Sequence, residues 1–185
     1  MNKNRNIMEL NTSKEQIINT SAIKIKKRDG RSEPLDIDKI HFVVEEACEG
    51  LAGVSSSQIE INANIQFYDG MTTKEVQQIL VRSANDLISL DAPNYQYAAA
   101  RLLSYDVRKE AHGQYEYMPL LKLILRNIKA GVYDKGIVEK YNKSEIKKMN
   151  TWIKRERDLD FTYAGLRQVV DKYLVQDRSS GDLLK

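Results

Sequence analysis

The chain has 185 residues, of which 42% are hydrophobic and 30% are charged, a composition that excludes a disordered or fibrous protein. Its 29 basic and 26 acidic residues leave a formal net charge of +3, which argues against a dedicated nucleic-acid binder. No apolar run reaches the roughly 20 residues that a membrane-spanning helix needs, so we expect a cytoplasmic protein without a membrane partner.

The first pattern along the chain predicts a short β-hairpin after a polar, mobile leader at residues 1–21. Ile23 and Ile25 alternate with lysines, which is the period-two pattern of a half-buried strand. Residues 29–30 are Asp-Gly and predict a tight turn, because glycine adopts a positive φ without steric cost. A return strand over residues 33–35 would lie at an edge, since its central proline has no amide hydrogen to donate.

Four helices are predicted after the hairpin. Asp36 or Asp38 would cap the first, and Thr72 with Glu75 three residues later forms a capping box for the third. Pro93 would stand in the first turn of the fourth. The expected spans are residues 37–51, a second helix that is broken at residues 68–70, and then residues 74–89 and 93–112.

The helical pattern continues after the fourth helix. An apolar stripe over residues 120–128 predicts a further helix, and two more are expected over residues 143–155 and 163–173. Trp152 is expected to be a packing anchor. A strand that enters a turn would follow at residues 174–177.

Sequence motifs of self-contained catalysis are missing. There is no phosphate-binding loop, no dinucleotide fingerprint, no zinc-protease helix, no Cys-x-x-Cys pair and no nucleophile elbow. His41 and His112 lie in different predicted helices, and Cys48 has no evident base. We therefore predict no catalytic residue and no metal ligand in this chain.

Basic residues nevertheless bracket the hairpin and the start of the first helix. Lys27, Arg28 and Lys39 would favour a phosphate there, together with exposed helix amides. Glu33 would accept hydrogen bonds from the exocyclic amine of a base, and nearby isoleucines would give its ring an apolar bed. Solvated lysines on a hairpin are the alternative, and the residues alone leave both interpretations open.

The chain resembles an ATP-cone, a small regulatory domain that begins many ribonucleotide reductase large subunits, in three successive runs. These are KKRDGRSEPLDIDKIHFVVEEACEGL at residues 26–51, IQFYDGMTTKEVQQILVRSANDLIS at residues 65–89 and DAPNYQYAAARLLSYDVRKEAHGQY at residues 91–115. A fourth run is YDKGIVEKYNKSEIKKMNTWIKRERDLDFTYAGLRQVVDKYLVQDRSSG at residues 133–181. This run resembles the helical start of the catalytic portion in class I enzymes of bacteria and their viruses.

The resemblance implies a mainly α fold with a small β-hairpin, in which residues 22–113 form the ATP-cone as a hairpin on a four-helix bundle. Residues 114–185 would be the incomplete helical start of the catalytic portion. The implied function is to bind ATP as an allosteric effector in deoxyribonucleotide synthesis. The catalytic barrel and its cysteines would follow residue 185. We therefore expect no ribonucleotide reduction by this chain alone, whether it is a truncation, one product of a split gene or an expressed fragment.

The resemblance also implies contacts to ATP, which would bind with Mg²⁺. It places Lys27 and Lys39 near the phosphates and Glu33 at the adenine. Thr73 and Lys109 match further contact positions of the family. The full set of implied ATP contacts is Lys27, Glu33, Pro34, Leu35, Asp36, Ile37, Asp38, Lys39, Thr73 and Lys109.

Two positions depart from the family's pattern. Some members carry histidines where Gln77 and Asp106 stand, at positions associated with inhibitory dATP binding. The carboxylate of Asp106 would repel a triphosphate beside it, so we expect dATP not to shut this version down. ATP binding is less affected, because the matched lysines remain.

The implied partners are the remainder of the large subunit and, through it, the radical-generating small subunit, in the host cytoplasm if the chain is encoded by a phage. An assembly module that has lost nucleotide binding is the alternative. A nucleic-acid-binding repressor, another setting of ATP-cones, is disfavoured by the missing Cys-x-x-Cys pair. The apolar stripes after residue 113 predict association with a second polypeptide or, in isolation, poor solubility.

Overall fold

The fold begins with the predicted hairpin. The computed structural model of the chain describes residues 23–174, so the predicted leader and nearly all of the last predicted strand lie outside the described residues. Strand β1 (Lys24–Lys26) pairs antiparallel with β2 (Ser32–Pro34), and Ile25 lies opposite Glu33. The alternation of the sequence is preserved, because Ile25 is buried while its two lysine neighbours are exposed.

The hairpin is tied to the loop that precedes α4 (Thr73–Asn85). The backbone amide of Lys26 donates to the carbonyl of Met71 at 2.8 Å, and the amide of Gly70 donates to the carbonyl of Lys24 at 2.8 Å. These bonds hold β1 beside the start of α4. They bring the lysines of the hairpin close to a helix N-terminus.

Four helices follow the hairpin, as the start signals predict. The side chain of Asp36 accepts a hydrogen bond from the amide of Lys39 at the start of the first helix. Thr72 and Glu75 form the reciprocal capping box of the third. The helices are α2 (Ile37–Cys48), α3 (Ser56–Asn64), α4 and α5 (Tyr95–His112).

The prediction that Pro93 stands inside the fourth helix is wrong, because α5 begins two residues later at Tyr95. The carbonyl of Pro93 accepts from the amide of Gln96 at 3.1 Å. A bond of this three-residue spacing closes a tighter turn than an α-helical bond. From Tyr95 the helix runs to Gly113, whose φ of 72° ends it, as expected for a residue without a side chain.

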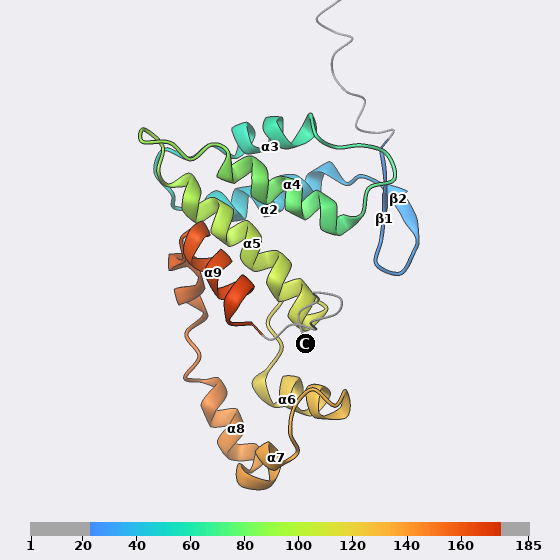
Figure 1. The fold of residues 1–185 in the computed structure, drawn as a ribbon, viewed down its shortest axis with the longest axis vertical. Helices are drawn as coiled ribbons and strands as arrows, with labels where there is room; N and C mark the ends of the chain where they lie inside the picture. The colour runs from blue at the N-terminus through green and yellow to red at the C-terminus, as the bar shows by residue number, and fades with distance from the viewer. Residues whose placement is uncertain (1–22, 175–185) are drawn as a thin grey trace, which may run out of the picture.

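The core surrounds α5, which packs against α2, α4 and α9 (Tyr163–Lys172) (Figure 1). Residues 98–100 are three consecutive, fully buried alanines in α5. Their small side chains allow the neighbouring helices to approach closely. The largest fully buried apolar side chains of this core are those of Val44, Ile59, Met71, Leu80 and Leu102.

After α5 the chain leaves this core and then returns to it. The helices α6 (Leu120–Lys129), α7 (Gly136–Lys140) and α8 (Lys143–Asn150) form an extension at the end of the molecule away from α3 (Figure 1). Within the extension, α6 packs against α8. A 3₁₀ helix, η2 (Arg155–Asp160), leads back, and two apolar side chains of α9 join the same core as the hairpin.

The helix predicted over residues 143–155 ends early, and Trp152 is not a packing anchor. Both the amide and the hydroxyl of Thr151 donate to the carbonyl of Lys148, at 3.0 and 2.8 Å. This local hydroxyl bond competes with the next helical bond and ends α8. Trp152 follows in the turn, with an exposed fraction of 64%.

The apolar stripe of α6 is only partly covered. Ile124 is buried, whereas Leu125 has an exposed fraction of 43%. The expected apolar stripe is therefore present, and part of it faces solvent in this chain.

Among the described residues, none of the helices combines the length and the apolar character needed to cross a membrane.

Candidate functional site

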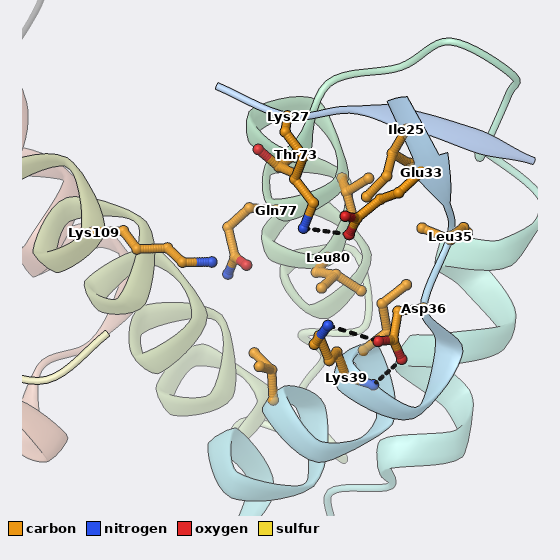
Figure 2. A pocket seen from close by; sticks show the side chains of 13 residues that line it. Ile25, Lys27, Glu33, Leu35, Asp36, Lys39, Thr73, Gln77, Leu80 and Lys109 are labelled. Carbon is orange, nitrogen blue, oxygen red and sulfur yellow. Dashed lines mark hydrogen bonds and ion pairs between the residues drawn. The ribbon is translucent and has the colours of Figure 1, made fainter. Parts of the chain in front are cut away.

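A pocket of about 110 Å³ lies between the hairpin, α2, α4 and α5 (Figure 2). Its apolar lining residues are Ile25, Leu35, Ile40, Val43, Val76 and Leu80. Its polar lining residues are Lys27, Glu33, Asp36, Lys39, Thr73, Gln77 and Lys109. An apolar surface beside converging charged groups suits a ligand with a flat apolar ring and an anionic group.

Three lysines reach this pocket from three different elements. Lys27 follows β1, Lys39 lies in the first turn of α2 and Lys109 lies in the last turn of α5. Two helices also begin at the pocket, since Asp36 caps α2 and Thr73 is the first residue of α4. Helix N-termini carry partial positive charge, so the lysines and the helix ends together favour an anion.

Two of these lysines are paired with carboxylates inside the pocket (Figure 2). Lys27 Nζ lies 2.5 Å from Glu33 Oε1, and Lys39 Nζ lies 2.8 Å from Asp36 Oδ2. The hydrogen bond from Lys39 lowers the pKa of the Asp36 carboxyl and raises that of the lysine. Ion pairs as accessible as these contribute little to stability, so an incoming anion can replace the carboxylates at little cost.

The third lysine, Lys109, lies close to Arg28, Lys27 and Lys39 and to one carboxylate, that of Asp106. Burial lowers the pKa of its ammonium group, and the nearby charges of Arg28 and Lys27 lower it further. The Nη1 group of Arg28 donates to the backbone carbonyl of Lys109 at 3.3 Å, which fixes the guanidinium close to the pocket. A bound anion would relieve this repulsion. Lys109 is therefore the clearest electrostatic sign of an anion site.

The two residues that depart from the family's pattern, Gln77 and Asp106, line different cavities. Gln77 lines the pocket, and its Nε2 donates to the backbone carbonyl of Leu102 at 2.8 Å. Asp106 instead lines a neighbouring cavity of about 300 Å³ between α4, α5 and α9. Burial, followed by the charge of Glu110, raises the pKa of Asp106. Its carboxylate thus adjoins the pocket without lining it, and it acts on the pocket through its charge, which Lys109 senses.

The structure brings most of the predicted contact residues together around the pocket. These are Lys27, Glu33, Leu35, Asp36, Lys39, Thr73 and Lys109. The remaining three do not line it. Pro34 is exposed on its strand, Ile37 packs against the core and Asp38 is exposed on α2. Sequence reasoning missed the apolar lining that the helices contribute, although helical spacing signals it: Val43, Val76 and Leu80.

The reactive side chains outside the pocket include Cys48, which is partly buried. Burial raises the pKa of the Cys48 thiol to about 11, which keeps the sulfur protonated and unreactive at neutral pH. Within the part of the chain that the structure describes, histidine, cysteine and acidic side chains nowhere gather to hold a metal ion. Cys48, the last residue of α2, is thus a partly buried side chain that packs against the core.

Residues 23–110 match the ATP cone domain family. This stretch holds the hairpin, α2, α3, α4 and nearly all of α5, and the whole pocket lies within it. The chain therefore carries an ATP-cone domain. The predicted mainly α fold with a small β-hairpin is confirmed.

Longer similarity extends this assignment beyond the pocket. The chain is 45% identical over 159 residues to the ribonucleoside-diphosphate reductase 1 subunit alpha of Escherichia coli (strain K12), a match that covers 86% of this chain and 21% of that protein. It is 44% identical over 162 residues to the subunit of the same name in Salmonella typhimurium, covering 88% and 21%. It is 38% identical over 161 residues to the subunit alpha of Helicobacter pylori strain 26695, covering 87% and 20%.

These matches show that the chain is homologous to the amino-terminal region of ribonucleoside-diphosphate reductase alpha subunits, as the resemblance predicts. The chain spans about a fifth of the length of these relatives, 21% of the Escherichia coli subunit.

Proposed function

We propose that this chain binds ATP in the pocket between the hairpin, α2, α4 and α5, as an allosteric effector in deoxyribonucleotide synthesis. The observation that carries the proposal is the convergence of Lys27, Lys39 and Lys109 on one pocket with an apolar lining. The match of the surrounding residues to the ATP cone domain supports the same function.

The lining suggests how ATP would lie. The adenine ring would pack on the apolar side chains, with its exocyclic amine directed to the carboxylate of Glu33. The triphosphate would bind the three lysines and the N-terminus of α4 at Thr73. Mg²⁺ would bind together with the triphosphate. Lys27 and Lys39 would exchange their carboxylate partners for phosphate oxygens, which leaves Glu33 free to accept from the base.

Calorimetric titration of the chain with magnesium and ATP tests this proposal directly. We expect saturable binding by the wild-type chain and at least a roughly hundredfold weaker affinity in the Lys27→Ala/Lys39→Ala double variant. The magnitude follows because each hydrogen bond to a charged group contributes about 1.5–3 kcal/mol. The matched control is Lys122→Ala/Lys147→Ala, which removes the same charge from exposed positions in α6 and α8.

The control variant should bind ATP like the wild-type chain. Absence of binding by a folded wild-type chain would leave an assembly module that has lost nucleotide binding, and the effector role would be abandoned. Equal losses in the two double variants would mean that net charge alone attracts ATP, without a specific site.

The wider setting follows from the homology. We infer that the chain works with the remainder of a reductase large subunit and, through it, with the radical-generating small subunit, in the cytoplasm. The partly exposed stripe of α6 offers surface for such an association.

A titration with dATP tests the expectation that this version resists inhibition. We expect dATP not to lower the activity of an assembled enzyme, because Gln77 and Asp106 stand where some family members carry the histidines associated with inhibition.

A further inference from the structure

The C-terminal end of α5 carries a cluster of aromatic rings around a half-buried cation, Arg108. The guanidinium carbon of Arg108 lies 4.9 Å from the ring centre of Tyr105, 4.8 Å from that of Tyr115 and 4.6 Å from that of Tyr117. The guanidinium carbon of Arg155 lies 4.4 Å from the ring centre of Tyr117. These five residues are called the Arg108 cluster below.

The guanidinium of Arg108 lies over the three tyrosine rings, and it also forms a side-chain hydrogen bond with Tyr117. Atoms Nε and Nη2 of Arg108 are buried and have no hydrogen-bond partner among the described residues. A guanidinium in such a site depends on its planar contact with the rings, because attraction to aromatic faces must offset part of the lost hydration. Small displacements of the rings therefore change its energy appreciably.

The cluster joins the ATP-cone to the segment that follows it. The hydroxyl of Tyr115 donates to Glu46 of α2, and the hydroxyl of Tyr117 donates to Asp158 of η2. Arg155 also belongs to η2. The cluster thus connects α2 and α5 on one side with η2, which lies between α8 and α9, on the other.

The next residue along α5 belongs to the nucleotide pocket. Lys109 lines the pocket, and its carbonyl accepts from Arg28 in the hairpin. Consecutive helical residues are about 100° apart around the axis, so the same turn presents Lys109 to the pocket and Arg108 to the cluster. Beyond them, Arg126 of α6 donates to the carbonyls of Ala111 and His112 at 2.5 and 3.1 Å. The last turns of α5 are therefore hydrogen-bonded both to the hairpin, through Arg28, and to α6, through Arg126.

We propose that the last turns of α5 transmit the occupancy of the pocket to η2 and the neighbouring helices, with Arg108 as the positioning residue. This inference rests on the proposed function, since the signal is a bound triphosphate. Its charge would attract the side chains of Lys109 and Arg28 and weaken the bond from Arg28 to the Lys109 carbonyl. The turn would then shift, and the ring contacts of Arg108 would pass the shift to Tyr117 and η2.

The chain contains its own reporter for this movement. Trp152 is its single tryptophan, and it is exposed in the turn between α8 and η2. It does not line the nucleotide pocket. A change in its emission on addition of ATP therefore reports a change in the segment after α5.

The test combines calorimetry with tryptophan emission on the full chain. In the wild-type chain we expect ATP to change the emission of Trp152 with the same midpoint as the heat of binding. The Arg108→Lys variant keeps the charge but loses the planar contact with the rings. It should bind ATP within about threefold of wild type and lose most of the emission change. The matched control is Arg82→Lys, an exposed position of α4, which should behave like the wild-type chain.

The possible failures are distinguishable. An unchanged emission response in Arg108→Lys, or heat of binding without any response in the wild-type chain, would overturn the coupling and leave the ATP site standing. Absence of heat in the wild-type chain would overturn the proposed function, and the coupling with it. If Arg108→Lys does not fold, Tyr117→Ala tests the same link, because it removes the ring that lies between Arg108 and Arg155 together with the bond to Asp158. A full response in that variant would also overturn the coupling.

Discussion

The ATP-cone and the extension formed by α6, α7 and α8 differ in how they are held together. The cone shares one continuous core, to which α9 contributes as well. In the extension, Ile124, Asn127 and Ile146 are buried, but they lie outside that core. One of these three is polar, and the Nδ2 atom of Asn127 has no hydrogen-bond partner among the described residues.

This difference separates a region that stabilises itself from one that depends on its attachments. A small satellite cluster buries little apolar surface, so its local opening requires much less free energy than global unfolding. The candidate pocket lies in the region with the shared core, whereas the extension is the region expected to open more easily. Substitutions placed in each of the two regions test this contrast.

The largest contrast is between a leucine in the shared core and one on the extension. Leu102→Ala in α5 should lower the free energy of unfolding by about 2–5 kcal/mol, because it leaves a cavity in a fully buried site. Leu125→Ala in α6 should change it by less than about 1 kcal/mol, since this side chain is 43% exposed. Urea unfolding followed by circular dichroism measures both. Equal losses would show that the extension is part of the same cooperative core.

A buried residue of the extension should affect that region alone. Ile146 of α8 is 1% exposed, and we expect Ile146→Ala to cost about 2–5 kcal/mol locally, which opens the α6–α8 contact. Native-state hydrogen exchange should then show faster exchange of the α6 and α8 amides, with unchanged protection in α4 and α5. Faster exchange throughout the cone would contradict the separation of the two regions.

Two capping boxes provide a matched pair with a smaller effect. Thr72 caps α4 and Asn142 caps α8, each with a glutamate three residues later. Thr72→Ala should lower the global free energy of unfolding by about 1 kcal/mol. Asn142→Ala should cost a similar amount in the local opening of α8 and leave the urea midpoint unchanged. A shift of the midpoint in the second variant would place α8 inside the global unfolding unit.

The two histidines should give the smallest effects, of opposite sign. A hydrogen bond with Glu60, followed by the charge of Glu45, raises the pKa of His41 above its ordinary 6.5. Burial, followed by the charges of Arg126 and Arg155, lowers the pKa of His112 below 6.5. His41 sits on α2, whereas His112 ends α5 beside the extension.

Linkage fixes the direction of each effect on stability. The stabilisation from His41 is complete below pH 6.5 and is lost as the pH rises through the raised pKa. The contribution of His112 is lost as the pH falls below 6.5 towards the depressed pKa, because only the unfolded chain takes up the proton there. The pKa values of the two histidines can be measured by NMR titration of their ring protons, with the signals assigned from His41→Gln and His112→Gln. We expect the pKa of His41 above 6.5 and that of His112 below 6.5. Two values on the same side would refute the assignment.

Much of the local structure could be predicted from the sequence. The hairpin, the Asp36 cap, the Thr72 capping box and the stop at Gly113 all depend on bonds or dihedral angles within a few residues. Such signals act before distant parts of the chain meet. The resemblance to the ATP-cone was equally visible, because the spacing of its runs is a property of the sequence.

Tertiary structure decided the features that require distant residues to meet. The packing of the helices places Lys109 and Lys27 around the same pocket. It places Asp106 at the neighbouring cavity and not in the pocket. It also assembled the Arg108 cluster around one half-buried cation and left Trp152 exposed. The physical reason is the same throughout. Periodicity states which side of a helix is apolar, but which partner covers each side depends on how the helices cross, and that is settled only when the whole core packs.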